Sequence, residues 1–507
     1  MKKIATFLCS FFLLAQMFGQ VFSDVTMESD ITDVQPMTGI VLWTTNPAKN
    51  TDVISLEYSY MLYNQVVTDE NVYDWSAVDD LLDAVASRGH QAILRFRFVY
   101  VGYQTSVPDY IKNLSDYHET EGLSEGLTTW FPDWTHPKLK DFTLQFYTKF
   151  AERYDDDPRL AFVQTGFGLW AEYHIYDGPF VLGQTFPSKA FQAEFLTHLD
   201  SVFVNTPWSI SIDAADDTYS PFDVQPNLLN LQFGNFDDSF MAKEHPYVNE
   251  GNWNFFGAER YKTSPAGGEF SYYTDWDQEH VLDWPNGAHG ISYEDFASKF
   301  LISYIIGNDQ PEYQSMERIK EASLASGYKF WVKSFKVAPD SAIIEIKNVG
   351  VGSFYYDAYP AVNGIRASES LKYLGKGESR VFHVGSGGDN PTLTIECDRL
   401  VPGQKIDFYG TTYVPVGIDE LAQKGSIFKV FPNILKNGDV VSVELNKVPS
   451  EKLRLELFGA NGQFVHSQPV DGRFNKLEIN QLQSGTYFLL LQNAHDILGV
   501  QRIVVQP

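Results

Sequence analysis

The sequence has little cysteine and far fewer basic than acidic residues, and both facts limit what the protein can be. Of 507 residues only two are cysteines, Cys9 and Cys397, so no framework of intrachain disulfides is expected. Cys397 is better interpreted as a small buried apolar side chain than as a reactive thiol. The formal net charge of −27 at pH 7 repels phosphate backbones, so nucleic acid is not an expected partner.

Long apolar runs are scarce too, and the one present lies at the N-terminus. Lys2 and Lys3 precede an apolar stretch from Ile4 to Phe18, and small or polar residues follow up to Ser23. This order is typical of a secretory signal peptide, which we predict over residues 1–23. The stretch is shorter than the roughly 20 apolar residues of a membrane span, and no later segment approaches that length. We therefore expect a protein without a membrane span that acts outside the cytoplasm.

Phosphate loops and closely spaced metal-ligand motifs are missing as well. No glycine-rich loop opens the first strand–helix unit, and no His-rich or His-Glu cluster has metal-site spacing. We therefore expect no cofactor and no bound metal. The acidic runs Asp155–Asp157 and Asp213 with Asp216 and Asp217 are interpreted as solvated turns rather than Ca²⁺ sites.

Strand and helix patterns alternate through the first part of the chain. The apolar run Ile54–Tyr60, a helix that ends before Gly89 and the run Gln91–Phe98 form one strand–helix–strand unit. Further strands, counted as the fourth to the eighth, are predicted at Leu160–Gly168, Trp208–Asp213, Leu228–Phe233, Gly267–Tyr272 and Phe300–Ile306. Such alternation predicts an α/β fold, a (β/α)₈ TIM barrel within residues 24–326 whose strands close between about Asp52 and Gly307.

From Gly327 onward the pattern changes to short β-type runs separated by turns, with no helix between them. This is typical of a β-sandwich, predicted over residues 327–413. A linker follows at 414–425, and a second β-sandwich is predicted over 426–507. The fold class is thus a barrel followed by two small β-sandwich domains.

The last domain resembles a known sorting domain through four segments in a fixed order. They are Phe431–Asn433, Leu453–Gln463, Leu482–Leu489 and Arg502–Val505. In this order they resemble the C-terminal sorting domain of the type IX secretion system. The resemblance implies a Bacteroidota-type host, the type IX machinery as a partner, and a secreted or cell-surface location. A generic adhesive sandwich is the alternative.

Two glutamates stand where a barrel carries its chemistry, at the C-terminal ends of strands. Glu172 lies in Trp170-Ala171-Glu172-Tyr173-His174, directly after the predicted fourth strand, and Glu269 follows two glycines on the predicted seventh. Glutamates after strands four and seven resemble those of the clan A retaining glycoside hydrolases, which include the β-galactosidases.

The opening unit also resembles that clan, through Tyr73-Asp74-Trp75 and the strand with Arg95 and Arg97. More narrowly, the barrel and the following sandwich resemble an uncharacterised bacterial glycosidase-like family with a Trp-Gly-Glu-Trp-His segment. One difference is Ala171, which stands where most clan A enzymes have an asparagine that contacts the sugar 2-hydroxyl. Either another group supplies that contact, or the segment aligns with the family in a different register.

The resemblance implies a two-step retaining mechanism. Glu269 attacks the anomeric carbon while Glu172 protonates the departing oxygen, and Glu172 then acts as base for water. A retaining pair needs carboxyl groups about 5 to 5.5 Å apart, whereas an inverting pair stands about 6.5 to 9.5 Å apart. Trp170 and Tyr173, with the charge of Glu269, are expected to raise the pKa of Glu172.

Other residues are candidates for substrate binding, each with a structural alternative. Arg95 and Arg97 alternate on one strand and both point into the barrel, or they form a buried ion pair. Loop tryptophans are sugar platforms or packing residues, and His174 and Tyr272 are site partners or core residues. The full set is Tyr58, Arg95, Arg97, Trp170, Tyr173, His174, Asn235, Trp253, Tyr272, Trp276 and Trp284.

The sequence therefore predicts a secreted glycoside hydrolase that cleaves a polysaccharide with Glu172 and Glu269. Export of the enzyme points to a polymer too large to enter the cell, and a plant or algal galactan such as agar or carrageenan is favoured. The alternative is a carbohydrate-binding surface protein on a barrel that has lost catalysis.

Overall fold

The structure is a computed structural model of the chain. It describes residues 21–283, 286–413, 427–436, 440–447, 453–459, 464–478, 482–492 and 497–506. The chain forms two compact units, one up to Thr412 and one from Tyr413. The linker predicted at 414–425 and most of the predicted signal peptide lie outside the described residues. Among the described residues, no helix combines the length and apolarity needed to cross a bilayer.

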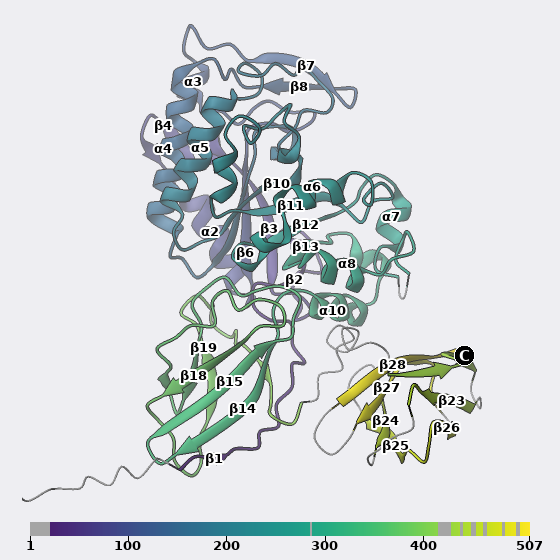
Figure 1. Ribbon diagram of the computed structural model, residues 1–507. Helices are drawn as coiled ribbons and strands as arrows, with labels where there is room; N and C mark the ends of the chain where they lie inside the picture. Colours follow the sequence, from purple (N-terminus) through teal and green to yellow (C-terminus); the bar gives the residue numbers. More distant parts are fainter. Residues whose placement is uncertain are drawn as a thin grey trace, which may run out of the picture. The chain divides into compact units, whose positions relative to one another are not determined.

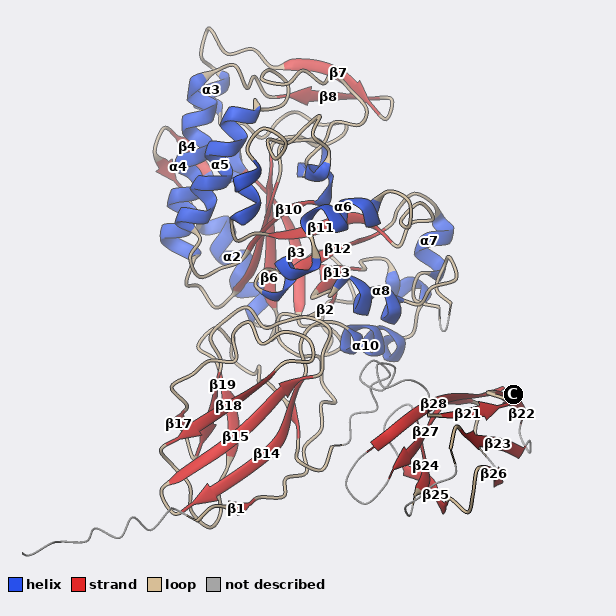
Figure 2. Cartoon of the chain, viewed as in Figure 1, coloured by secondary structure: helices blue, strands red, loops and turns tan. Residues whose placement is uncertain are grey.

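The first unit contains a closed barrel of eight parallel strands, which confirms the predicted barrel (Figure 2). Each strand pairs with the next in the chain, and the last pairs with the first. The strands are β2 (Gly39–Trp43), β3 (Leu56–Leu62), β6 (Gln91–Arg97), β9 (Leu160–Thr165), β10 (Trp208–Ser211), β11 (Gly234–Phe240), β12 (Ala266–Phe270) and β13 (Tyr304–Ile306). Glu172 therefore follows the fourth strand, and Glu269 lies on the seventh.

The first and sixth strands differ from the prediction. The first strand of the barrel begins at Gly39, before the predicted start near Asp52. The strand has only five residues, so its apolar run is too short to stand out in the sequence. Residues 226–230 form a 3₁₀ helix that begins at Pro226, and the sixth strand is Gly234–Phe240. That strand carries two aspartates in its middle, so it has no apolar run to mark it.

Packed side chains fill the barrel interior. The Arg95 guanidinium donates to Oε1 of Gln164 at 2.8 Å, and the Gln164 amide donates to the hydroxyl of Tyr304 at 2.8 Å. The Tyr304 ring occupies the space in front of Gly267, where a Cβ would lie 2.2 Å from the ring. The glycine is required by this close approach.

Helices cover the outside of the barrel (Figure 1). The longest carries Leu139, Phe142, Phe146 and Phe150 on one face, and all four are buried, as the spacing of an amphipathic helix requires. The α-helices are α1 (Tyr63–Val66), α2 (Ser76–Ala86), α3 (Asp109–Lys112), α4 (Pro137–Tyr154), α5 (Lys189–Val202), α6 (Asn249–Phe256), α7 (Asp275–His280), α8 (Tyr293–Phe300), α9 (Gln310–Tyr313) and α10 (Met316–Ala325). Two short hairpins are β4 (Val67–Asp69) with β5 (Val72–Tyr73), and β7 (Thr120–Ser124) with β8 (Leu127–Phe131).

A β-sandwich follows the barrel within the same unit. One sheet has the order β1-β14-β15-β18 with β20 beside β14, and the other has the order β17-β16-β19. The strands are β1 (Ser23–Asp24), β14 (Phe330–Ala338), β15 (Ser341–Asn348), β16 (Tyr359–Val362), β17 (Ile365–Arg366), β18 (Ser379–Val384), β19 (Leu393–Glu396) and β20 (Phe408–Tyr409).

The sandwich packs against the N-terminal end of the barrel (Figure 1). The hydroxyl of Tyr356 donates to the carbonyl of Ala161, at the start of β9, and Arg399 donates to the carbonyl of Leu160 at 3.3 Å. Because this end is covered, the open end of the barrel is the one where the strands terminate. A TIM barrel carries its reacting groups at that end.

The second unit is a separate pair of sheets. Their orders are β21-β23-β26 and β22-β28-β27-β24-β25. Leucines, valines, one phenylalanine and one isoleucine form its own buried core. The strands are β21 (Phe428–Phe431), β22 (Ile434–Lys436), β23 (Val440–Leu445), β24 (Arg454–Gly459), β25 (Phe464–Pro469), β26 (Phe474–Glu478), β27 (Gly485–Gln492) and β28 (Ile497–Gln506).

Candidate active site

A tight loop after β9 presents Glu172. The amide of Gly168 donates to the carbonyl of Glu172 at 2.8 Å, and the amide of Leu169 donates to that of His174 at 3.0 Å, so the loop folds back on the strand end. A Cβ on Gly168 would lie 1.8 Å from the His174 carbonyl oxygen. Trp170 has a φ of 57°, a conformation that a non-glycine residue adopts only when its surroundings hold it.

The side chain of Glu172 is buried and contacts a histidine. It is 8% exposed, and its Oε2 lies 2.8 Å from Nε2 of His174. Burial and the negative charge of Asp238 raise the pKa of Glu172 well above its ordinary value, against the opposing effect of His174. A carboxyl in this position tends to hold its proton, as a general acid must.

His174 lies between two carboxyl groups. Its Nδ1 atom is 3.3 Å from Oδ2 of Asp213, which follows β10 and accepts a hydrogen bond from the Ser211 hydroxyl at 2.6 Å. Burial lowers the pKa of His174, but Asp213 and Glu172 outweigh this effect and raise the pKa to about 9. The imidazole therefore fixes the orientation of Glu172 while it carries a proton at neutral pH.

Glu269 lies near the end of β12 and is half-buried. Burial and the charge of Asp238 raise its pKa to about 8, while Arg95 and the indole N–H of Trp43 act in the opposite direction. Gly268, directly before it, lies against β11, where a Cβ would meet the Asp237 carbonyl oxygen at 2.3 Å. The glycine lets the two backbones approach at the position where the carboxyl is presented.

Asp238 and Tyr60 link the two glutamates into one site. The charge of Asp238 raises the pKa of both Glu172 and Glu269, and both glutamates in turn raise the pKa of Tyr60. The hydroxyl of Tyr60 donates to the Trp170 carbonyl at 3.0 Å. Arg95 holds Asp238 through two hydrogen bonds of 3.1 Å each.

Aromatic rings surround this network on the side of β3 and β6. Tyr58 is 1% exposed, and this burial raises the pKa of its hydroxyl. The charge of Arg95 lowers that pKa and the charge of Glu269 raises it, so Tyr58 lies close to the site. The ring of Tyr100 lies 4.4 Å from that of Trp170. The guanidinium of Arg97 lies 4.0 Å from the centroid of the Tyr100 ring.

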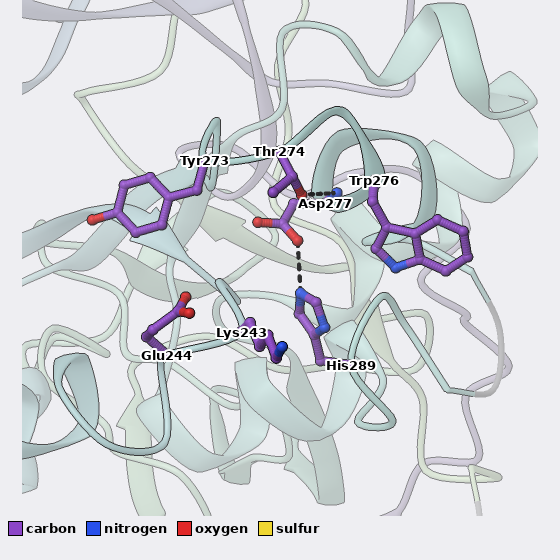
Figure 3. Close-up of a pocket in the computed structure, with 7 residues that line it drawn as sticks. All are labelled: Lys243, Glu244, Tyr273, Thr274, Trp276, Asp277 and His289. Carbon is purple, nitrogen blue, oxygen red and sulfur yellow. Dashed lines mark hydrogen bonds and ion pairs between the residues drawn. The ribbon is translucent and has the colours of Figure 1, made fainter. Parts of the chain in front are cut away.

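A cavity of about 440 Å³ lies among the loops that follow β11 and β12 (Figure 3). Tyr273 lines the cavity; burial raises the pKa of its hydroxyl, and the charges of Asp213 and Glu172 add to this rise. Trp276 is 55% exposed at the cavity, and His289 contacts Asp277 at 2.6 Å. The lining residues are Lys243, Glu244, Tyr273, Thr274, Trp276, Asp277 and His289.

Three candidate substrate-binding residues lie in the core instead. Tyr173 is fully buried between Phe167 and Phe186. Asn235 is fully buried in β11 and donates to a carbonyl of β10. Trp253 is 2% exposed, and its indole donates to Asp237 at 2.9 Å, so neither ring face is open to a sugar. These placements correct the expectation that they line the site.

The remaining candidates differ in position. Tyr272 is 49% exposed, and burial of its hydroxyl together with Glu269 and Asp309 raises its pKa, so it lies at the rim of the site. Trp284 lies outside the described residues. Arg95 forms the buried ion pair that the sequence left as one alternative.

One group of side chains has the spacing of a metal site. Glu172, His174 and Asp213 each offer a ligand atom within 4.8 Å of the others. The acidic run at 155–157 is structural, because Asp155 accepts backbone N–H groups of residues 204–206 and Asp157 pairs with Arg159 at 2.5 Å.

Comparison with known families identifies the C-terminal segment. Residues 429–506 match the family described as the secretion system C-terminal sorting domain. The match confirms the sorting domain predicted from the sequence and indicates that the protein is exported. A search of curated proteins found no match.

Solved structures with detectable similarity include glycoside hydrolases. The GH36 α-galactosidase AgaA from Geobacillus stearothermophilus has 11% identity and a TM-score of 0.34, over 69% of this chain and 55% of its own. An endo-1,4-β-xylanase from Caldicellulosiruptor owensensis has 10% identity and a TM-score of 0.34, over 53% of this chain and 84% of its own. The chain thus spans about half of the galactosidase. Both TM-scores lie below 0.5, so the barrel is established by its own strand pairing.

Sequence reasoning missed four residues of the site. Trp43 ends the first strand, which the prediction placed elsewhere, and Asp238 lies in the displaced sixth strand. The sequence pattern indicates only a strand at Tyr60 and a solvated turn at Asp213. For Trp43 and Tyr60 a signal existed, since each is an aromatic residue at the C-terminal end of a barrel strand.

Proposed function

We propose that the barrel is a glycoside hydrolase that cleaves a polysaccharide by a retaining mechanism, with Glu172 and Glu269 as its two carboxyl groups. The observation that carries this proposal is the pair itself. Glu172 follows the fourth strand and Glu269 lies on the seventh, the charge of Asp238 raises the pKa of both, and both add to the rise that burial causes in the pKa of Tyr60. Carboxyl pairs of this kind are the machinery of glycoside hydrolysis.

The two steps assign a role to each carboxyl. In the first, ionised Glu269 attacks the anomeric carbon and forms a glycosyl ester, while Glu172 gives its proton to the departing oxygen. In the second, Glu172 takes a proton from water, and the water oxygen displaces Glu269 from the anomeric carbon. The contact with His174 orients Glu172 toward the leaving oxygen in the first step and toward the attacking water in the second.

The environments of the two glutamates support these roles. Burial and Asp238 raise both pKa values. The guanidinium of Arg95 and the indole of Trp43 oppose this rise at Glu269, and the imidazole of His174 opposes it at Glu172. The two groups beside Glu269 stabilise its carboxylate, which supports its role as the nucleophile.

The substrate class follows from location and from the resemblance to galactosidase-containing barrels. An exported hydrolase meets polymers outside the cell, and exposed rings such as Trp276 offer faces on which sugars stack. We propose a plant or algal galactan, such as agar or carrageenan, as the substrate.

One observation favours a second candidate function. A pKa of about 8 for Glu269 leaves the nucleophile mostly protonated at neutral pH. A barrel that binds polysaccharide without cleaving it tolerates this, whereas a hydrolase needs the carboxylate. The second candidate is therefore a carbohydrate-binding surface protein.

Release of reducing ends from a panel of polysaccharides tests the proposal. The wild-type protein is compared with Glu172→Gln, Glu269→Gln and the control Glu152→Gln, which changes an exposed glutamate on α4. The proposal expects loss of turnover by orders of magnitude in the first two variants only. NMR of the first-formed anomer then checks retention. Polysaccharide binding without reducing ends at any pH from 5 to 10 supports the second candidate instead.

A further inference from the structure

Arg97 differs from the other barrel arginines in that its side chain donates to neither a carboxylate nor a backbone carbonyl among the described residues. Each of the others donates a hydrogen bond to a carboxylate or a backbone carbonyl; they are Arg88, Arg95, Arg153, Arg159, Arg260 and Arg318. Within the described part of the chain, Arg97 makes neither kind of contact, and its Nε atom is buried with no hydrogen-bond partner. Burial lowers the pKa of its guanidinium.

Three tyrosine rings lie around this guanidinium. It lies 4.0 Å from the centroid of the Tyr100 ring, 5.8 Å from that of Tyr60 and 5.9 Å from that of Tyr103. A guanidinium stacked on a ring through its flat face keeps the N–H groups of its edge available. That edge matches the two oxygens of a carboxylate or a sulfate.

The position of Arg97 places this edge beside the proposed catalytic pair. Arg97 is the last residue of β6, two residues beyond Arg95, so both side chains leave the same face of the strand. Arg95 is saturated by Asp238, Gln164 and the Trp170 carbonyl. The Tyr100 ring on which Arg97 stacks also contacts the ring of Trp170, two residues before Glu172.

The charge around the site makes a free cation there unusual. Glu172, Glu269, Asp238 and Asp213 gather at this end of the barrel, and the whole chain carries a net charge of −27. Such a site repels a polyanion unless a local cation compensates. A buried guanidinium N–H group without a hydrogen-bond acceptor lowers the stability of the protein. An anionic ligand would supply the acceptor that Arg97 lacks.

We propose that Arg97 binds an anionic group of the substrate, a sulfate ester or a uronate carboxylate, on a sugar next to the bond that is cleaved. This inference rests on the proposed function and narrows its substrate class to acidic polysaccharides. The stacked guanidinium donates two parallel hydrogen bonds to the anion, and the surrounding tyrosines contact the sugar ring.

Matched polymers test the inference. κ-Carrageenan is compared with its desulfated form, and polygalacturonate with its carboxyl-reduced form, so the two sources of the anion are separated. We expect the wild-type protein to act on one charged polymer with a kcat/KM at least about tenfold higher than on its neutral counterpart. In Arg97→Gln this preference should disappear, so that the kcat/KM values for the charged and the neutral polymer become equal within about twofold.

Two further variants keep the test decisive. Lys138→Gln removes the same charge from the exposed side of α4 and should keep the preference, which excludes a general charge effect. Arg97→Lys keeps the charge without the flat donor edge and should restore the preference only in part. Thermal unfolding of each variant shows whether the fold is intact, and Arg97→Lys carries the test if Arg97→Gln does not fold.

Failure of this inference differs from failure of the proposed function. If the wild type acts on each neutral polymer as well as or better than on its charged counterpart, the role of Arg97 is overturned. The proposed hydrolase function is not affected by that result. An undiminished preference in folded Arg97→Gln does the same. If no polymer is cleaved, calorimetric binding of the same four polymers decides: binding of a charged form that Arg97→Gln loses supports the anion site, and its absence overturns it.

Discussion

Arg95 and Asp238 form a bidentate ion pair in the barrel interior, with two N–O distances of 3.1 Å. The arginine is 1% exposed and the aspartate 11%. The pair joins the third barrel strand, β6, to the sixth, β11. The charge of its aspartate raises the pKa of both Glu172 and Glu269. A buried pair of this kind is costly to break, because the remaining partner is left charged and unpaired.

We predict that Asp238→Asn lowers the pKa of Glu269. The negative charge of Asp238 raises that pKa, whereas Arg95 lowers it, so removing the aspartate acts twice in the same direction. The acidic limb of the kcat/KM profile should move to lower pH. The free energy of unfolding should fall by about 3 to 5 kcal/mol, because Arg95 loses its partner. An acidic limb that does not move in the folded variant would contradict the assignment.

The pH profile of the wild-type protein gives a second prediction. Glu269 acts as a carboxylate, and burial with Asp238 raises its pKa to about 8, so kcat/KM should rise with pH up to about 8. At higher pH it should fall again as Glu172 loses its proton. The two apparent values belong to the interacting pair. A profile that is flat from pH 6 to 9 would exclude Glu269 as the nucleophile.

The same shift predicts how stability depends on pH. The folded-state pKa of Glu269 lies above its unfolded value, so the unfolded chain releases this proton first as the pH rises. Stability should therefore fall between about pH 4.5, the ordinary value, and pH 8. Glu269→Gln removes the group that ionises. Denaturant titrations should show a shallower fall with pH for this variant than for the wild type.

Much of the fold, but only part of the site, could be predicted from the sequence. Alternating apolar runs predict the barrel because strand and helix periods are local properties. Glu172 could be found because it follows such a run, and Glu269 because it lies on a predicted strand of the barrel. Asp238 was not, because its strand carries Asp237 and Asp238 in place of apolar residues.

Partners from different loops could not be predicted in the same way. The contact between His174 and Asp213 joins the loops after β9 and β10, and no local pattern indicates that distance. Trp253 resembled a sugar platform in the sequence, yet its indole lies in the core and donates to Asp237. Whether an aromatic ring is buried depends on packing between elements far apart in the chain.

Gly168→Ala should reduce activity more than stability. A Cβ at this position would lie 1.8 Å from the His174 carbonyl oxygen, so the loop that carries Glu172 has to move. A displacement of about 1 Å at a catalytic group lowers turnover about 10²-fold. The control is Gly385→Ala, directly after β18 in the sandwich, where a Cβ meets nothing within 4 Å. Equal turnover in both variants would show that the loop conformation does not position Glu172.

Removal of the sorting domain should leave hydrolysis intact. Every site residue named above lies in the first unit, and the second unit has its own buried core of leucines and valines. A chain that ends at Thr412 should therefore keep kcat/KM within about twofold of the full chain. The measurement is release of reducing ends by both purified proteins on the same polysaccharide. A large loss in a folded truncated chain would place part of the site in the C-terminal unit.

A shorter truncation gives the contrasting result that makes this test specific. A chain that ends at Gly327 also lacks the β-sandwich, whose Tyr356 and Arg399 bond to the backbone at the start of β9. The apolar residues that the sandwich covers at the barrel end, Tyr58 and Phe162 among them, belong to one shared core. Exposing them removes a large part of the burial that stabilises the barrel. This chain should fail to fold, whereas the chain that ends at Thr412 should melt at a temperature close to that of the barrel in the full protein.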